Sequence, residues 1–341
     1  MPSRDASKKK GRAHRGARSE HSRARVDATG AVRRRHPANG ASDEGPSTPG
    51  NRDLALRLEA SIESDGRTHR TGVLPPPSAD EVTAATERLR WLLFPGFLGP
   101  RELAQHSAGR FVASVLRDVR RRLEPQLVAA FADGDRRAVV SVRPRARRVL
   151  DEYLDRLPAI RDTLAFDVQA AFDGDPAARS LDEIILCYPG ILALSVHRLS
   201  HELFVRGVPL IARVMSEWAH RQSGIDIHPG ARIGKGCFLD HGTGIVIGET
   251  TEIGDFCKIY QGVTLGAKSF EREGDGRIKR DYKRHPTLED HVTVYAGATI
   301  LGGDTIIGRR SVINGGVFLT RSVPPDYIVQ APKAELHLRT R

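Results

Sequence analysis

Residues 225–265 read IDIHPGARIGKGCFLDHGTGIVIGETTEIGDFCKIYQGVTL, and apolar residues recur at every sixth position along this stretch. Glycine often follows the apolar residue directly, at Gly234, Gly248, Gly254 and Gly266. This period predicts a parallel β-helix, in which three short strands form each coil of roughly 18 residues. A β-sandwich would instead show alternation of period two between turns, which this stretch lacks. The inward positions are Ile227, Ile233, Leu239 and Ile245 in a first phase, and Ile247, Ile253, Ile259 and Leu265 in a second.

The same period returns after an interruption at residues 266–286. The interrupting sequence, GAKSFEREGDGRIKRDYKRHP, is too polar and too charged to be a buried coil, so we expect it to protrude as a loop. A loop carried on a rigid solenoid is a natural place to bind a substrate. The later inward positions are Leu288, Val294 and Ile300, followed after a slip of one residue by Ile307, Ile313 and Leu319.

Residues 53–222, which precede the repeat, have a helical spacing of apolar residues and predict an α-helical domain. One helix is marked by Val82 and Leu89, and Ser78 with Glu81 forms a capping-box sequence before it. Glycine and proline separate the other segments. Further helices are expected over residues 101–132, 146–172, 190–205 and 208–222.

The N-terminus is basic and poor in large apolar residues. Residues 1–50 contain 12 Lys or Arg against 5 Asp or Glu, so they carry +7 of the net charge of +11. They contain no Leu, Ile, Phe, Tyr or Trp, and cannot bury enough apolar surface to offset the entropy lost on ordering. We therefore expect a disordered tail over residues 1–52. No aromatic residues are interleaved for stacking on bases, so nucleic acid is not the expected partner.

The sequence does not indicate a membrane protein or a disulfide-bonded one. No apolar run reaches the ~18 residues of a membrane span, and no signal segment follows the basic start. The three cysteines, Cys187, Cys237 and Cys257, form no CxxC pair and support neither a disulfide framework nor a zinc site. These features predict a soluble, cytoplasmic protein.

Five segments resemble the serine O-acetyltransferases, and together they span roughly residues 170–325. They are DIHPGARIGKGCFLDHGTGIVIGET at 226–250, YQGVTLG at 260–266, KRHP at 283–286, YAGATILGG at 295–303 and SVPP at 322–325. The resemblance implies an α+β multidomain chain whose β-helix, residues 223–325, is left-handed and is followed by a tail at 326–341. It also implies transfer of the acetyl group of acetyl-CoA to the hydroxyl of L-serine, giving O-acetyl-L-serine for cysteine biosynthesis.

His241 matches the catalytic base of that family, which takes the proton of the serine hydroxyl as its oxygen attacks the thioester. An imidazole with a pKa near ~6.5 suits this proton transfer at neutral pH. Asp226 lies 15 residues earlier, slightly less than one coil, and is expected in the adjacent layer within reach of the imidazole. A carboxylate there would fix the tautomer of His241 and stabilise the imidazolium. A lone His or Asp is more often structural, so the resemblance carries these two roles.

The resemblance also implies the contacts to serine. Asp175 and Asp240 receive its ammonium group. Arg284 and His285 hold its carboxylate. This distribution suits a zwitterion, because each end of the amino acid meets the opposite charge.

Gly266 and Ala296 match family positions where the pantetheine arm of CoA passes between neighbouring solenoids. Acetyl-CoA is implied as a co-substrate, with no permanently bound cofactor and no metal. The implied assembly is a homotrimer or a dimer of trimers, because members of the family complete the active site between adjacent prisms. The chain ends DYIVQAPKAELHLRTR, without the GVPA-type segment and Ile-ended tail of the family. The resemblance therefore does not carry over a complex with O-acetylserine sulfhydrylase, which grips that tail.

Three alternative functions are left open by the residues alone. A zinc enzyme on the same solenoid, similar to a carbonic anhydrase, would need three histidines to converge on zinc across a subunit interface, and His228, His241, His285 and His291 supply enough imidazoles. A trimeric scaffold or polyanion-binding protein would use only the basic tail. Another hexapeptide-repeat acetyltransferase would act on a sugar or another small molecule, and would have no use for the serine-binding residues.

Overall fold

The computed structural model describes residues 49–101, 108–332, 337 and 339. The chain divides into two compact units between Asp65 and Gly66. The described part of the first unit contains helix α1 (Pro49–Ser64), which begins before the expected helical boundary at residue 53. The predicted disordered tail lies, up to residue 48, outside the described residues.

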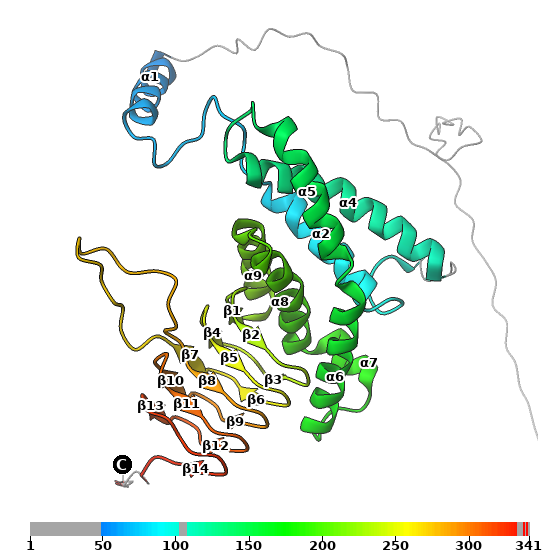
Figure 1. The fold of residues 1–341 in the computed structure, drawn as a ribbon, viewed down its shortest axis with the longest axis vertical. Helices are drawn as coiled ribbons and strands as arrows, with labels where there is room; N and C mark the ends of the chain where they lie inside the picture. The colour runs from blue at the N-terminus through cyan, green and yellow to red at the C-terminus, as the bar shows by residue number, and fades with distance from the viewer. Residues whose placement is uncertain (1–48, 102–107, 333–336, 338, 340–341) are drawn as a thin grey trace, which may run out of the picture. The chain divides into compact units, whose positions relative to one another are not determined.

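Helices form the first part of the second unit, as the apolar spacing predicts (Figure 1). The Ser78 hydroxyl accepts the N–H of Glu81 at 3.3 Å, so half of the predicted capping box forms. The other half does not, because the N–H of Ser78 donates to the side chain of Gln126 instead. The helices described in this unit are α2 (Ala79–Leu93), α4 (Ala108–Ala132), α5 (Val139–Leu154), α6 (Leu157–Gly174), α7 (Leu181–Cys187), α8 (Pro189–Val205) and α9 (Pro209–Ser223).

The single helix predicted over residues 146–172 is wrong, because this segment belongs to two helices. Helix α5 ends at Leu154 and α6 begins at Leu157, with Pro158 in its first turn. Proline lacks an N–H and its ring clashes with a preceding turn, so it begins a helix more readily than it continues one. The short helix α7 has no counterpart among the predicted helices, and the Ser180 hydroxyl caps its first turn. No helix in the described segments is long and apolar enough to cross a membrane.

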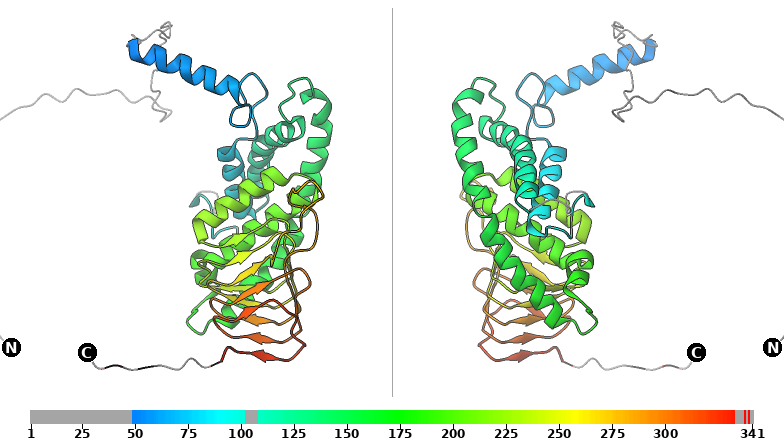
Figure 2. Two further views of the ribbon diagram at one scale, coloured as in Figure 1. Left: turned by 90° about the vertical axis from the view of Figure 1, so that its left-hand side faces the viewer. Right: turned by 90° about the vertical axis from the view of Figure 1, so that its right-hand side faces the viewer.

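From Asp226 onward the chain forms a parallel β-helix of short stacked strands, which confirms the predicted repeat (Figures 1 and 2). The stacked strands form three sheets in which every strand pair is parallel. The first sheet contains β1 (Asp226–Ile227), β4 (Val246–Ile247), β7 (Thr264–Gly266), β10 (Thr299–Leu301) and β13 (Phe318–Leu319). The second contains β2 (Arg232–Ile233), β5 (Glu252–Ile253), β8 (Thr287–Leu288) and β11 (Ile306–Ile307). The third contains β3 (Phe238–Asp240), β6 (Lys258–Tyr260), β9 (Thr293–Val294), β12 (Val312–Ile313) and β14 (Ile328–Val329).

The prism has three corners, and each corner joins two of the sheets. The first corner leads from the third sheet to the first and includes the segment between β3 and β4. The second corner leads from the first sheet to the second, and the third corner from the second sheet to the third. Side chains on different corners therefore project from different edges of the prism.

The first corner is enlarged where it follows β3. Ile247, and not Ile245, takes the inward position beside Ile227, so the inward residues of β3 and β4 are eight positions apart instead of six. Ile245 is buried, but within the corner. The backbone turns there through positive φ angles of 54° at His241 and 86° at Gly242. The two phases in the sequence are thus one repeat with two extra residues. The predicted slip of one residue in the later coils is confirmed by the strand register.

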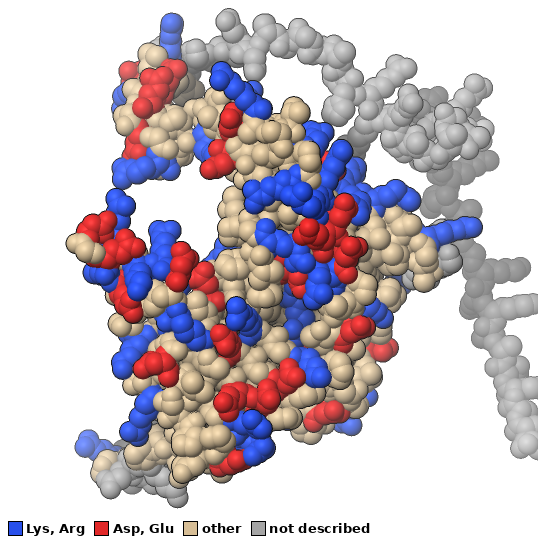
Figure 3. Space-filling model, in the orientation of Figure 1, with Lys and Arg blue, Asp and Glu red and all other residues tan. Residues whose placement is uncertain are grey.

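Residues 267–286 protrude between β7 and β8, as their polarity predicts (Figure 1). Most of the loop is exposed, including the apolar side chains of Phe270 and Ile278. Over the β-helix and this loop, Figure 3 shows Lys and Arg interspersed with Asp and Glu on the visible face. The charges on that face are mixed and do not form a single basic patch.

A buried ion pair joins two helices to the β-helix. Arg198 of α8 donates to the carboxylate of Asp167 of α6 through Nε at 2.7 Å and Nη2 at 2.8 Å. The same guanidinium donates to the carbonyls of Ile233 and Gly234, and Asp167 accepts the N–H of Cys237 at 3.0 Å. This network holds α6 and α8 in a fixed position on the first coil.

Candidate active site

The first candidate cluster lies where strand β3 ends. Asp240 is the last residue of that strand, and its side chain is largely buried. Its Oδ1 accepts the backbone N–H of His241 at 2.9 Å, and its Oδ2 lies 3.8 Å from Nε2 of the His241 ring. The His241 side chain is 69% exposed at the enlarged first corner. The imidazole is therefore close to a carboxylate and still open to a reactant.

Two glycines allow helices α6 and α8 to approach this end of β3 closely. A Cβ atom on Gly174, at the end of α6, would lie 2.6 Å from the ring of Phe238. A Cβ atom on Gly190, in the first turn of α8, would overlap the carbonyl oxygen of Leu239. The residues beside these glycines, Asp175 and Tyr188, are thereby brought to the cluster.

The Asp175 carboxylate is held by two donors. Its Oδ1 accepts the N–H of Ala177 at 2.8 Å, and its Oδ2 accepts the hydroxyl of Tyr188 at 2.5 Å. The Tyr188 hydrogen bond, followed by the Ala177 N–H and the charge of His241, lowers the pKa of Asp175. Burial raises the pKa of Asp240, and the negative charge of Asp175 raises it further. The two carboxylates of the cluster therefore differ in how readily they take up a proton.

The second candidate cluster lies at the second corner, at the base of the protruding loop. Burial, together with the positive charge of Arg284, lowers the pKa of His285 to about 4. The N–H of Thr250 donates to Nδ1 of His285 at 3.1 Å, which requires that this nitrogen carries no proton. Nε2 of the neutral ring is then a hydrogen-bond donor. Arg284 forms an ion pair with Glu249, so its guanidinium is fixed before any ligand arrives.

The structure brings some of the predicted site residues together and separates others. Asp175, Asp240 and His241 share the first corner, and Arg284 and His285 share the second. Across the described chain, no hydrogen bond or ion pair joins these two clusters. They lie at opposite ends of the strands of the first sheet, because one chain cannot fold two corners of a prism onto each other.

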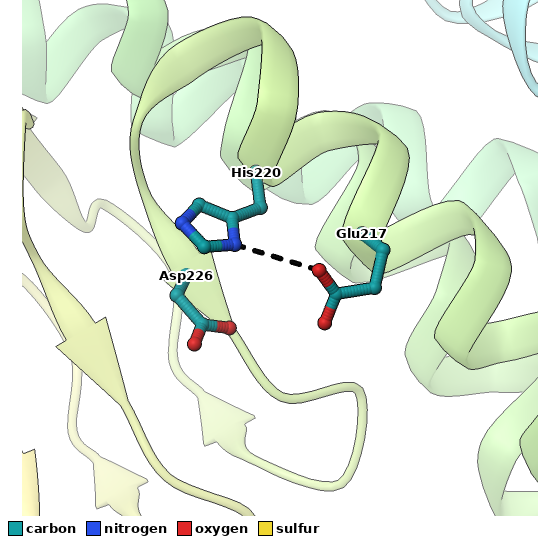
Figure 4. Close-up of side chains that lie close together, drawn as sticks. All are labelled: Glu217, His220 and Asp226. Carbon is teal, nitrogen blue, oxygen red and sulfur yellow. Dashed lines mark ion pairs between the residues drawn. The ribbon is translucent and has the colours of Figure 1, made fainter.

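Asp226 lies in the coil adjacent to that of His241, and Ile225 before it occupies the space beside Gly242. Within the described residues, no hydrogen bond or ion pair links the side chains of Asp226 and His241. Asp226 pairs with Val246 of the next coil, beyond the enlarged corner. Its carboxylate lies instead near Glu217 and His220 of α9, whose Oε2 and Nδ1 atoms are 3.5 Å apart (Figure 4).

The histidines considered for a zinc site between subunits lie at different corners of one chain. His228 and His285 lie at the second corner and His241 at the first. His291 lies at the third corner, where its ring stacks on Phe256 at 5.4 Å. The glycine and alanine expected along the pantetheine path are also apart, with Gly266 at the second corner and Ala296 at the first.

Sequence reasoning missed three side chains or backbone groups that contact the predicted site residues. Tyr188 belongs to a CYPG segment with no indication of a role, and its contact with Asp175 depends on the packing of α8. Glu249 and Thr250 lie in the GET segment that was quoted for the resemblance, so that segment could have drawn attention to them. A cavity of about 340 Å³ beside them is also lined by Lys283 of the loop. A larger cavity of about 630 Å³, between α6, α8 and the second sheet, contains none of the predicted site residues.

Comparison with known proteins identifies the family. No family model matches the sequence. A plasmid-encoded serine acetyltransferase of Synechococcus elongatus is 46% identical over 266 residues, which cover 75% of this chain and 82% of the relative. The structure of serine acetyltransferase 1 of Entamoeba histolytica in complex with L-cysteine has a TM-score of 0.64 and 35% identity, and covers 82% of this chain and 97% of that one. Serine acetyltransferase of Brucella abortus strain S19 in complex with coenzyme A has a TM-score of 0.50 and 27% identity, over 84% of this chain and 88% of that one. Because the first of these relatives shares almost half of its residues over most of its length, the chain belongs to the serine acetyltransferase family.

Proposed function

We propose that this chain transfers the acetyl group of acetyl-CoA to the hydroxyl of L-serine. The observation that carries the proposal is the pair of clusters with opposite charge. Asp175 and Asp240 lie beside the exposed imidazole of His241. A fixed guanidinium and a neutral imidazole, Arg284 and His285, form the other cluster. A small zwitterion that carries a hydroxyl on a short side chain fits this arrangement, and the names of the relatives support it.

In the proposed reaction, His241 is the general base. Its imidazole takes the proton of the serine hydroxyl while the hydroxyl oxygen forms a bond to the thioester carbonyl carbon. The C–S bond then breaks, and the imidazolium returns the proton to the thiolate of CoA. Asp240 is close enough to stabilise the imidazolium, and Asp226 is the partner that the family resemblance implies. The CoA complex of the Brucella relative supports acetyl-CoA as the donor.

We infer that the complete site forms between two copies of the chain, in a homotrimer. The two clusters lie at opposite ends of the strands of the first sheet. The second corner of one copy must therefore meet the first corner of another to enclose serine. Exposed Val246 and Phe318 on the first sheet would be covered in such an assembly. Co-expression of His241→Ala with Arg284→Ala tests this, because some interfaces of a mixed trimer would contain two intact clusters. Recovery of activity is expected, whereas two variants that remain inactive together would contradict a shared site.

Two further inferences concern the cellular setting. We propose a reducing, cytoplasmic location, supported by three free cysteines of which Cys237 and Cys257 are buried. We also propose that L-cysteine competes with serine, because the two amino acids share both charged ends and a relative was solved with L-cysteine bound.

A thiol-release assay with acetyl-CoA tests the proposed reaction directly. L-serine should release CoA, and the product should be O-acetyl-L-serine by mass. Matched acceptors are L-homoserine, which moves the hydroxyl by one carbon, and a hexose, which lacks both charged ends. Faster release with the hexose than with serine would replace the proposal with another small-molecule acetyltransferase.

A further inference from the structure

The hydroxyl of Tyr188 makes a contact to a predicted substrate-binding carboxylate that the family resemblance does not assign. It donates to Oδ2 of Asp175 at 2.5 Å, and the tyrosine ring is half-buried. Tyr188 ends α7 and precedes the first turn of α8, with Pro189 directly after it. A residue before proline is restricted to extended backbone, and Tyr188 has φ −81° and ψ 120°. The backbone therefore presents the phenol from a rigid junction.

The close approach of α8 to β3 fixes where that phenol points. No side chain larger than hydrogen fits at Gly190 without overlapping the carbonyl oxygen of Leu239, one residue before Asp240. The same strand supports the end of α6, where Asp175 follows the helix. Packing against β3, the strand that leads into His241, thus fixes the positions of both the Tyr188 hydroxyl and the Asp175 carboxylate.

We propose that Tyr188 is a positioning residue for the serine ammonium group, acting by orienting the carboxylate of Asp175. The inference rests on the proposed function and names a new contributor to it. A carboxylate has about four lone pairs for hydrogen bonds. The Ala177 N–H and the Tyr188 hydroxyl each occupy one lone pair, on different oxygens. The remaining lone pairs of the carboxylate therefore face a defined direction.

The surrounding charges show why Asp175 needs such a partner. From the end of β3 it is faced by Asp240, whose pKa the negative charge of Asp175 raises, and by His241, whose positive charge lowers the pKa of both carboxylates. Tyr260 of β6 is also within electrostatic reach of both carboxylates, and Glu183 of α7 faces Tyr188. Tyr188 is the first cause of the lowered pKa of Asp175. Without its hydroxyl, two neighbouring carboxylates would share protons at a higher pH.

The test compares Tyr188→Phe with the wild type in the full-length protein. Loss of a hydrogen bond to a charged group should raise the KM for L-serine about tenfold. The kcat and the KM for acetyl-CoA should stay within about twofold, since the hydroxyl touches neither the base nor the donor. The rise in serine KM on acidification should begin at a higher pH in the variant. Tyr327→Phe, which removes an exposed hydroxyl in the last coil, is the matched control and should behave as the wild type.

A double-mutant comparison separates positioning from packing. If Tyr188 acts through Asp175, then Tyr188→Phe added to Asp175→Asn should raise the serine KM no further than Asp175→Asn alone. Tyr188→Met, which also lacks the hydroxyl but has a different shape, should reproduce the shift seen with phenylalanine. Losses that simply add, an unchanged serine KM, or equal changes in the KM of both substrates would overturn the inference.

The failure of the proposed function remains distinguishable from the failure of this inference. Calorimetric binding of L-serine is measured beside turnover. A wild type that binds serine without releasing CoA would refute the reaction, while the affinity of Tyr188→Phe for serine would still decide the role of Tyr188. A wild type that binds no serine would refute both.

Discussion

The imidazole ring of His285 lies directly against the backbone of Gly248 in the preceding coil. A Cβ atom on Gly248 would overlap both Cδ2 and Nε2 of that ring. The absence of a side chain at Gly248 is therefore what allows His285 to keep its Nδ1 against the N–H of Thr250.

Gly248→Ala should impair serine binding more than folding. The new methyl group must displace the His285 ring, and such overpacking typically costs ~1–3 kcal/mol. We expect at least a tenfold increase in the KM for serine, at nearly unchanged KM for acetyl-CoA, in steady-state kinetics. Gly274→Ala is the control, because nothing lies within 4 Å of a Cβ atom at that loop position. A Gly248→Ala enzyme with wild-type serine KM would show that His285 does not contact the substrate.

His241→Ala should lower kcat by ~10²- to 10⁴-fold, the usual contribution of a general base. Serine should still bind, which calorimetry can measure. A near-normal kcat would require another base.

The carboxylate that supports His241 can be identified by comparing Asp226→Asn with Asp240→Asn. The effective partner should show a loss in kcat that is strongly non-additive with His241→Ala, as expected for residues that act as one unit. The 3.8 Å separation in this structure favours Asp240, whereas the family resemblance favours Asp226. Additive losses for both would mean that neither carboxylate works through the imidazole.

Stability should fall as the pH decreases from about 6.5 to about 4 because of His285. Its pKa is about 4 in the folded chain and ~6.5 in an unfolded one, so the unfolded chain binds more protons in this interval. The stability that His285 contributes as a neutral, buried ring is fully present above its pKa in the unfolded chain. This stability is lost as the pH falls towards its pKa in the folded chain. In denaturant titrations, His285→Gln should lose less stability than the wild type between these two pH values. Equal losses would mean that His285 titrates normally.

Removing one partner of the buried ion pair should destabilise the protein strongly. Arg198→Met leaves the Asp167 carboxylate buried without its cation, which typically costs ~3–5 kcal/mol. Unfolding in urea should show this as a lower midpoint. The double variant Arg198→Met with Asp167→Leu should be more stable than Arg198→Met alone, since it contains no unpaired charge. A double variant less stable than Arg198→Met would mean that the unpaired Asp167 carboxylate is not what destabilises the single variant.

The sequence predicts the β-helix well because its signal is repeated. Ile233, Ile253 and Leu288 are stacked inward residues of one sheet, and each could be located from the six-residue period alone. The enlarged corner was hidden because Ile245 and Ile247 are both buried apolar residues, so the period seemed to restart. Only the strand register shows which of them faces the interior.

The site was less predictable than the fold, since it depends on contacts between distant segments. Asp240 and His241 are neighbours in the sequence and were found together. The contact between Tyr188 and Asp175 requires two helix ends to meet on one strand, and no local pattern encodes that. Asp226 lies in the coil adjacent to His241, as the spacing predicts, but the spacing alone could not show that its carboxylate lies near Glu217 and His220 of α9.

The two extra residues at the first corner lie outside the stacked strands, so they do not disturb the register of the coils above and below. Reactivity and architecture are consequently separable in this protein. Shortening the corner to the regular six-residue spacing should leave a well-folded β-helix without acetyltransferase activity. Lengthening or trimming such corners is then a route by which one scaffold can acquire or abandon a reaction during evolution, without any change to its core.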